Sequence, residues 1–404
     1  MIKIIYILLL IAVSDNLYAN YKLVSQDIDI SLEDEKQENF FQRNFVSPED
    51  GWLDGTYWLL TNPIGFVPVP FFFGSSIIGQ GGGLGLVFMK PQEKDYDIVN
   101  PKTPDLYTLV GFKTGKDDWG VVGGYRVLFK NDKIRWTGVL GRANLDIDGY
   151  YSWGVFKKRY ASFGFNIQTD VLSQKLQYEI SDSKVYLGVS YSIFANKLNF
   201  QRDSINEVYN EIPDEDKVGR VAALTPILTY DTRDSIFTPN NGIYANLYYE
   251  LYRKSLGGNY DFDLIDFVFL TFIPLSNSVV SSSYFNFKRL VSGRNPFYLQ
   301  PSINLRGIPL FYYQGDTIVA AEEELRWDFY KRFSIVGFGG VGMTSSDGYA
   351  RDEGEVVGEY GVGLRYLISK PLKMQGGFDV AWGPSKKPFI YFQFGTAWIL
   401  RALM

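Results

Sequence analysis

The reactive side chains of this 404-residue sequence are carboxylates, tyrosines, lysines and arginines, because it contains no histidine and no cysteine. That composition excludes thiol and imidazole nucleophiles, Cys/His metal centres and a Ser-His-Asp triad. Three acids, Glu322, Glu324 and Asp328, lie close enough in sequence to act as general acid and base. Without histidine beside them, we expect no enzymatic activity, no metal and no cofactor.

One arginine, Arg306, lies in a long connection between expected strands. It belongs to Asn304-Leu305-Arg306-Gly307-Ile308, within a 25-residue connection from Val291 to Gly315. A connection of that length between regular elements is typical of a functional loop.

A third charged grouping precedes a turn. Asp231, Arg233 and Asp234 are followed by Pro239 and by Asn240-Asn241-Gly242. Asn and Gly tolerate the positive φ of a tight hairpin, and alternating charges can bond across it. We interpret this segment as structural and not catalytic.

The elements that hold these groups are strands. From Phe66 onward, apolar and polar residues alternate between turn clusters, as in Ile243 to Tyr252, where Leu247 and Tyr248 lie on opposite faces. The pattern predicts sixteen strands, near 67–77, 82–90, 105–113, 119–129, 133–147, 161–179, 184–198, 220–231, 242–253, 260–273, 279–290, 316–328, 333–343, 357–368, 373–382 and 388–399.

The apolar faces of these strands are rich in aromatic residues, which make up 17% of the chain, while mean hydropathy is near neutral. A soluble β-sandwich would also alternate, but it would not need tyrosine and tryptophan near the strand ends. A barrel in lipid does, and closure satisfies its backbone groups. We therefore predict an all-β fold, a sixteen-stranded antiparallel transmembrane β-barrel.

The N-terminal residues have the pattern of a secretory signal. An apolar run from Ile4 to Val13 follows Lys3, and Leu17-Tyr18-Ala19 has the pattern of a cleavage site, so residues 1–19 are predicted to be a signal peptide. Residues 20–50 are polar and acidic, and residues 20–65 are expected to form a periplasmic leader or plug before a barrel of residues 66–404. The alternative to a signal peptide is an N-terminal membrane anchor. The net charge of −5 gives no reason to expect nucleic-acid binding.

These motifs resemble those of the BamA/TamA surface-antigen superfamily. Leu305-Arg306-Gly307-Ile308 is similar to its loop motif, Val/Leu-Arg-Gly-aromatic, although Ile308 lacks the ring. The segment from Asp231 to Gly242 is similar to the family's Asp-x-Arg-Asp…Pro-x-x-Gly signature. Phe338 to Gly342 is similar to Phe-x-Asp-x-Gly, with Gly340 in place of the aspartate.

The resemblance implies that the long loop folds into the barrel and that Arg306 reaches acids on the wall. Glu324 has the parity of an inward residue, and Asp379 could replace the missing aspartate; a solvated role for Asp379 is equally open. The family's POTRA domains are not expected, because the 46 residues from Asn20 to Gly65 are too few for a domain of about 50 residues. An unknown periplasmic partner could take their place.

Pro68 and Pro70 lie in the first predicted strand and remove two donors from the same edge. If that edge faces the last strand, the barrel has a weak seam; if it faces the second strand, or if the prolines precede the strand, it does not. Gly79, Gly81, Gly82 and Gly83 would serve a flexible gate or a tight turn.

The resemblance implies an outer-membrane protein of a Gram-negative bacterium that inserts or translocates client outer-membrane or secreted proteins. Its other expected contacts are membrane lipid and lipopolysaccharide. The alternative is a passive or gated pore, since sixteen strands can enclose a channel. Against a pore, the long loop offers few charges, Arg294 and Arg306 among them.

Overall fold

The computed structural model describes residues 39–61, 66–75, 79–90, 103–115, 118–151, 161–200, 214–309, 312–345, 354–384 and 388–399. The predicted signal peptide lies outside them. The helices are α2 (Phe40–Phe45), α3 (Thr56–Thr61) and α5 (Asp214–Lys217), with short 3-10 turns at Lys254–Leu256 and Phe297–Leu299. None of the described helices has the length and apolar character needed to cross a membrane.

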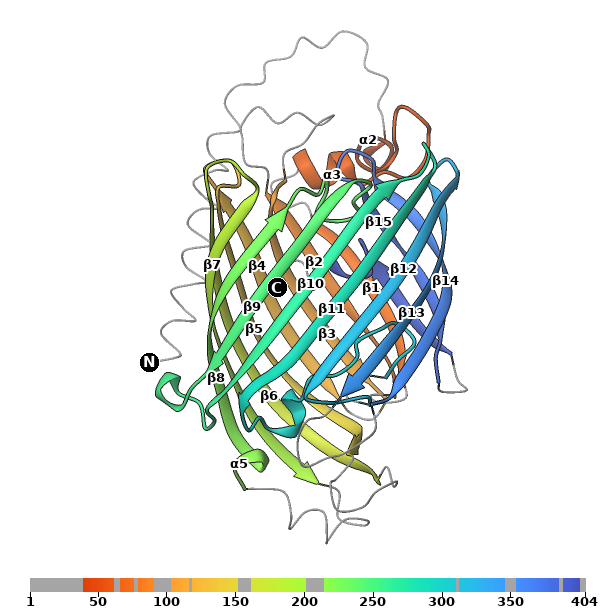
Figure 1. The fold of residues 1–404 in the computed structure, drawn as a ribbon. Helices are drawn as coiled ribbons and strands as arrows, with labels where there is room; N and C mark the ends of the chain where they lie inside the picture. Colours follow the sequence, from red (N-terminus) through yellow and green to blue (C-terminus); the bar gives the residue numbers. More distant parts are fainter. Residues whose placement is uncertain are drawn as a thin grey trace.

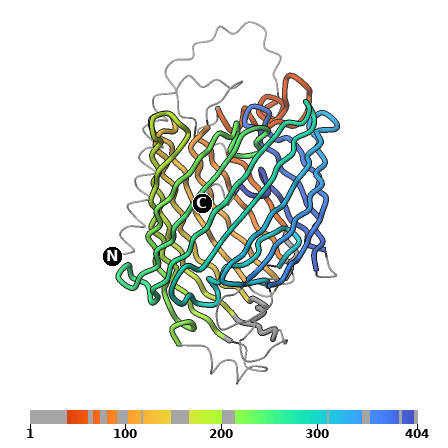
Figure 2. The backbone as a smooth tube through the Cα atoms, in the orientation of Figure 1, coloured from red at the N-terminus to blue at the C-terminus, as the bar shows by residue number. Residues whose placement is uncertain are grey.

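Sixteen strands form the wall: β1 (Phe66–Ser75), β2 (Gly79–Lys90), β3 (Asp105–Thr114), β4 (Trp119–Phe129), β5 (Ile134–Tyr151), β6 (Ala161–Glu179), β7 (Val185–Phe200), β8 (Val218–Asp231), β9 (Gly242–Tyr252), β10 (Phe262–Pro274), β11 (Val279–Gly293), β12 (Thr317–Tyr330), β13 (Phe333–Ser345), β14 (Val356–Ser369), β15 (Met374–Trp382) and β16 (Phe389–Phe394). Each pairs antiparallel with its neighbours in sequence, and β1 pairs with β16 to close the barrel. Figures 1 and 2 show the tilted strands closing on themselves. The predicted fold class is confirmed.

Alternation along each strand separates the two faces of the wall. Along β9, Tyr244 and Asn246 are buried inside, whereas Leu247 and Tyr249 are exposed outside. Large apolar side chains cover the exterior of the other strands as well, including Leu140, Leu172, Leu187, Leu228, Leu325, Val362 and Phe378. An apolar exterior around a polar interior is the arrangement of a barrel in lipid.

Two predictions are wrong. Gly79, Gly81, Gly82 and Gly83 do not form a tight turn, because they lie in β2 and pair with β1. The last strand was expected to reach residue 399, but β16 ends at Phe394. At Gly395 the backbone adopts φ +76°, a conformation that glycine allows at little cost, and the chain leaves the wall.

Residues 39–61 lie across one end of the barrel, which we call the α3 end; the opposite one is the α5 end (Figure 1). Arg332, in the turn between β12 and β13, is fully buried beneath this segment and donates to Asp50 (2.9 Å) and Asp54 (2.7 Å). Thr56 Oγ1 lies 2.7 Å from Ser369 Oγ, and Gly55 N–H donates to the carbonyl of Ile368. The described part of the predicted leader is therefore attached to the barrel.

Candidate functional site: the lumen arginine cluster

The connection between β11 and β12, residues 294–316, folds back into the barrel. Ile303, Leu305 and Ile308 are buried in a cluster with inward residues of five strands. Those wall residues are Tyr244, Val268, Leu270, Phe272, Tyr284, Ile318, Ala320 and Val357. Ile308 packs in this cluster although it lacks the aromatic ring of the family motif. Apolar burial on one side of the loop holds it inside the lumen.

Arg306 is the polar centre of this loop. It is 8% exposed. Its Nη1 donates to Glu324 at 2.6 Å and to Asp379 at 3.1 Å, and its Nε and Nη2 both donate to Glu322, at 3.0 and 2.7 Å. The guanidinium also lies 3.4 Å from the ring centroid of Phe338. All three guanidinium nitrogens are therefore engaged, which anchors the loop to β12 and β15.

Asp379 joins two arginines. Besides Arg306, it accepts from Arg365 Nη1 at 2.6 Å and Arg365 Nη2 at 2.9 Å, and its side chain is fully buried. Tyr391 on β16 donates its hydroxyl to the carbonyl of Arg306. The loop is thus bonded to both strands of the last hairpin, β15 and β16.

Glycines allow the loop to approach the wall so closely. A Cβ on Gly307 would lie 2.7 Å from the carbonyl oxygen of Trp382 and 2.8 Å from Glu359 Cβ. A Cβ on Gly340 would lie 2.9 Å from Glu359 Oε1 and 3.2 Å from Glu322 Cβ. Glu359, on the neighbouring strand, therefore lies against the position where the family motif has an aspartate. Its two carboxylate oxygens have no hydrogen-bond partner among the described residues.

The segment from Asp231 to Gly242 forms a second cluster at the α3 end. Arg233 donates to Asp231 through Nε (2.8 Å) and Nη2 (3.0 Å), and Arg135 donates to the same acid at 2.9 Å. Asp234 accepts from the backbone N–H of Asn240 at 3.0 Å. Pro239 is buried, and Gly242 adopts φ +116°. Sequence reasoning anticipated a tight hairpin, but ten residues, 232–241, separate the strands.

That long turn crosses the mouth of the barrel to reach the opposite wall. Ile236 and Phe237 pack with Leu59, Val69, Leu372 and other residues near β1 and β15. Ser235 Oγ donates to the carbonyl of Leu372 (2.9 Å), and the N–H of Thr396 donates to the carbonyl of Phe237 (2.7 Å). The C-terminal segment continues inward, and Trp398 stacks on Tyr284 with centroids 5.6 Å apart.

The joint between the first and last strands is short. β1 and β16 pair only at Phe73 with Tyr391 and Gly74 with Ile390, whereas β1 and β2 pair at ten positions. The ladder to β2 runs unbroken through Pro68 and Pro70. Because proline has no N–H to donate, the N–H groups that bond to β2 must belong to the residues that alternate with the prolines, such as Val69. The missing donors therefore lie on the β16 side.

Sequence reasoning named Arg306, Glu324 and Asp379, and the structure brings all three together. It did not assign Glu322, Glu359 or Arg365 to the cluster, nor the stacking of Arg306 on Phe338. The inward parity of Glu322 was a usable signal. Glu359 and Arg365 also have inward parity, but nothing local to them points to a loop that is distant in sequence.

No protein-family model matches this sequence, and no curated protein matches it. Solved structures do. BamA from Haemophilus ducreyi lacking POTRA domains 1–3 aligns with a TM-score of 0.51 at 15% identity, over 82% of this chain and 70% of that chain. CdiB from Acinetobacter baumannii aligns at 0.54 and 10% identity, over 81% of this chain and 59% of that chain. CdiB from Escherichia coli aligns with a TM-score of 0.54 at 11% identity, over 81% of this chain and 62% of that chain.

This chain thus spans about three fifths of the CdiB chains that it resembles. At these identities the likeness concerns the fold. In its fold, the chain is a BamA/CdiB-type barrel.

Proposed function

We propose that this protein is an outer-membrane barrel of a Gram-negative bacterium that inserts or translocates other proteins through a seam between β1 and β16. The observation that carries the proposal is the two-residue pairing of these strands, next to two prolines that remove two donors from the same edge. An unpaired strand edge can accept a strand of another chain. The fold shared with BamA and CdiB supports both the location and the function.

The arginine cluster has a supporting role in this mechanism. Arg306 binds acids of β12 and β15, and its carbonyl accepts from Tyr391 of β16. The loop therefore fills the lumen on the inner side of the seam. Opening between β1 and β16 would not require the loop to leave its other anchors. Clients would be nascent outer-membrane or secreted proteins that present β-strands.

A disulfide across the seam tests the proposal. Gly74 and Ile390 are partners across β1 and β16, and the chain has no natural cysteine to interfere. The double variant Gly74→Cys/Ile390→Cys should form a cross-link, since paired positions in a sheet bring Cα atoms within disulfide range, about 5.5 Å. In liposomes that contain the barrel, folding of an added outer-membrane client should be accelerated by the reduced form only.

The matched control places the cross-link elsewhere in the wall. Val362 and Val380 are partners across β14 and β15 and face outward. Their double cysteine variant should accelerate client folding whether oxidised or reduced. Equal activity of the oxidised and reduced seam variant would rule out a lateral opening between β1 and β16.

A further inference from the structure

The exterior of β5 to β8 changes from apolar to polar within one row of residues. In the register of these strands, Leu140, Leu172 and Ile193 are cross-strand neighbours on the outward face. The next outward row toward the α5 end consists of Arg142, Asp170, Ala195 and Arg220, and the row after it includes Trp119, Asn144, Gln168 and Lys197. Polar side chains therefore begin directly beside the lipid-facing belt, at the level of a membrane interface.

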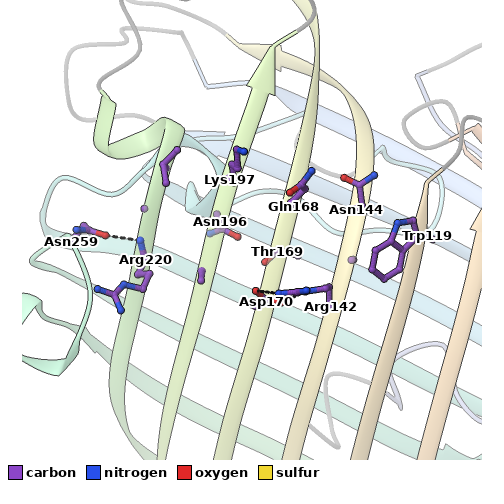
Figure 3. A pocket seen from close by; sticks show the side chains of 14 residues that line it. Trp119, Arg142, Asn144, Gln168, Thr169, Asp170, Asn196, Lys197, Arg220 and Asn259 are labelled. Carbon is purple, nitrogen blue, oxygen red and sulfur yellow. Dashed lines mark hydrogen bonds and ion pairs between the residues drawn. The ribbon is translucent and has the colours of Figure 1, made fainter. Parts of the chain in front are cut away.

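These two rows line a recess of about 700 Å³ on the outside of the wall (Figure 3). Ala195 stands between Asp170 and Arg220 in the first polar row, the one next to the apolar belt. Because Ala195 has a short side chain, the surface is hollowed there. Asn259, from the connection between β9 and β10, accepts from the backbone N–H of Arg220 at 2.6 Å and borders the recess.

The recess carries a net positive charge. Asp170 is paired with Arg142, whose Nε and Nη2 lie 2.5 and 2.8 Å from the two carboxylate oxygens. Lys197 and Arg220 are exposed, and among the residues that the structure describes neither has an ion-pair partner. One acid therefore faces three cations. Trp119 is 40% exposed at the end of the second polar row, the one nearer the α5 end. Tryptophan is enriched at membrane interfaces.

We infer that this recess binds the phosphate groups of lipopolysaccharide, with Lys197 and Arg220 as the phosphate ligands. Ammonium and guanidinium groups form charge-assisted hydrogen bonds with phosphate oxygens. A lipid is favoured over free phosphate because the row next to the recess is apolar and would contact the acyl chains of the same molecule. The inference rests on the outer-membrane location proposed above, but not on any action on client proteins.

A binding experiment tests the site directly. The full chain, folded in neutral detergent micelles, is titrated with fluorescent diphosphoryl lipid A and with a fully dephosphorylated form that has the same acyl chains. The parent should prefer the phosphorylated form. The variant Lys197→Gln/Arg220→Gln should lose roughly 25-fold in affinity for it, about five-fold for each charge removed, and should bind the two forms alike.

The control removes two exposed lysines at the opposite end, Lys130 and Lys184, in the turns after β4 and β6. Lys130→Gln/Lys184→Gln should bind diphosphoryl lipid A as the parent does. No phosphate preference in the parent, or equal losses in both double variants, would overturn the assignment. Competition by millimolar inorganic phosphate as effective as that by unlabelled lipid A would overturn the lipid in favour of a free anion. Because no client is present, failure of the insertion hypothesis would leave this result unchanged.

Discussion

At the scale of single residues, charge balance around Arg306 governs the lumen cluster. Arg306 and Arg365 face four acids, Glu322, Glu324, Glu359 and Asp379, within the described residues of the cluster. Charges removed from water are tolerated when carboxylates and guanidiniums meet in hydrogen-bonding geometry. The arginines meet this condition, whereas Glu359 does not.

Arg306→Ala should therefore destabilise the barrel. Three wall acids would lose their common partner, and breaking a buried pair by removing one side costs about 3–5 kcal/mol. The free energy of unfolding, measured by urea titration in lipid vesicles, should fall by that amount. Arg142→Ala, which removes an exposed arginine of the outer wall, should cost less than about 1 kcal/mol. Equal losses in the two variants would contradict the anchoring role of Arg306.

Glu359→Gln should have the opposite effect. The substitution replaces a buried carboxyl whose oxygens have no hydrogen-bond partner among the described residues. It supplies a permanent amide donor beside Glu322, whose Oε2 also has no partner there. An unsatisfied buried group costs about 1–3 kcal/mol, so stability should rise by up to that amount. The same urea titration measures it. Glu324→Gln serves as the control, because it weakens a bond to Arg306 and should lower stability.

At the scale of elements, the barrel is closed at its α3 end by segments that belong to no strand. The leader with α2 and α3 binds the turns after β12 and β14, while the turn after β8 reaches across to β15. Polar bonds fix both segments. The leader depends in particular on Arg332, which Asp50 and Asp54 cover.

Acid should release the leader. Burial alone would raise the pKa of Asp50, but hydrogen bonds from Arg332, from the N–H of Trp52 and from Lys370 lower that pKa well below its usual value. A carboxyl with a lowered pKa stabilises the folded state fully above its unfolded pKa, about 4. This contribution falls progressively as the pH drops from that value toward the lower folded-state pKa, so part of it is already lost at pH 3.

Digestion by an acid-active protease should thus cut residues 39–61 faster at pH 3 than at pH 5, with the barrel intact. The Asp50→Asn variant should be cleaved faster than the parent already at pH 5, and its cleavage rate should change less between the two pH values. A rate independent of pH in the parent would show that the Asp50 ion pair does not hold the leader.

At the scale of the whole molecule, the sixteen-stranded wall encloses a lumen that is filled from both ends. The loop of residues 294–316 enters from the α5 end, and the turn of residues 232–241 and the segment around Trp398 fill the α3 end. The alternative function, a passive pore, requires a continuous water path through this lumen.

Conductance in planar bilayers should accordingly be small and flickering for the parent. Arg306→Ala should raise both the conductance and its fluctuations, because the loop loses its polar anchor while its apolar contacts remain. A large, steady conductance that is the same in parent and variant would favour the passive pore. Arg142→Ala, on the outer wall, should leave the recordings unchanged.

The sequence by itself determined the class of the fold and most of its strands. Alternation is a local property, since successive side chains of a strand point to opposite faces, and lipid demands that one face be apolar. For the same reason the inward parity of Glu324 and Asp379 could be read from their own strands. The Arg306 motif was recognisable because it lies within five contiguous residues.

Only the tertiary structure decided how distant segments meet. Glu359, Arg365 and Tyr391 join Arg306 through the closure of the wall, a relation between strands that no local period encodes. The end of β16 at Phe394 depends on Gly395 and on contacts across the lumen, so alternation predicted it too long. The edge on which Pro68 and Pro70 lack donors likewise depends on pairing with β2, and pairing is a property of two strands and not of one.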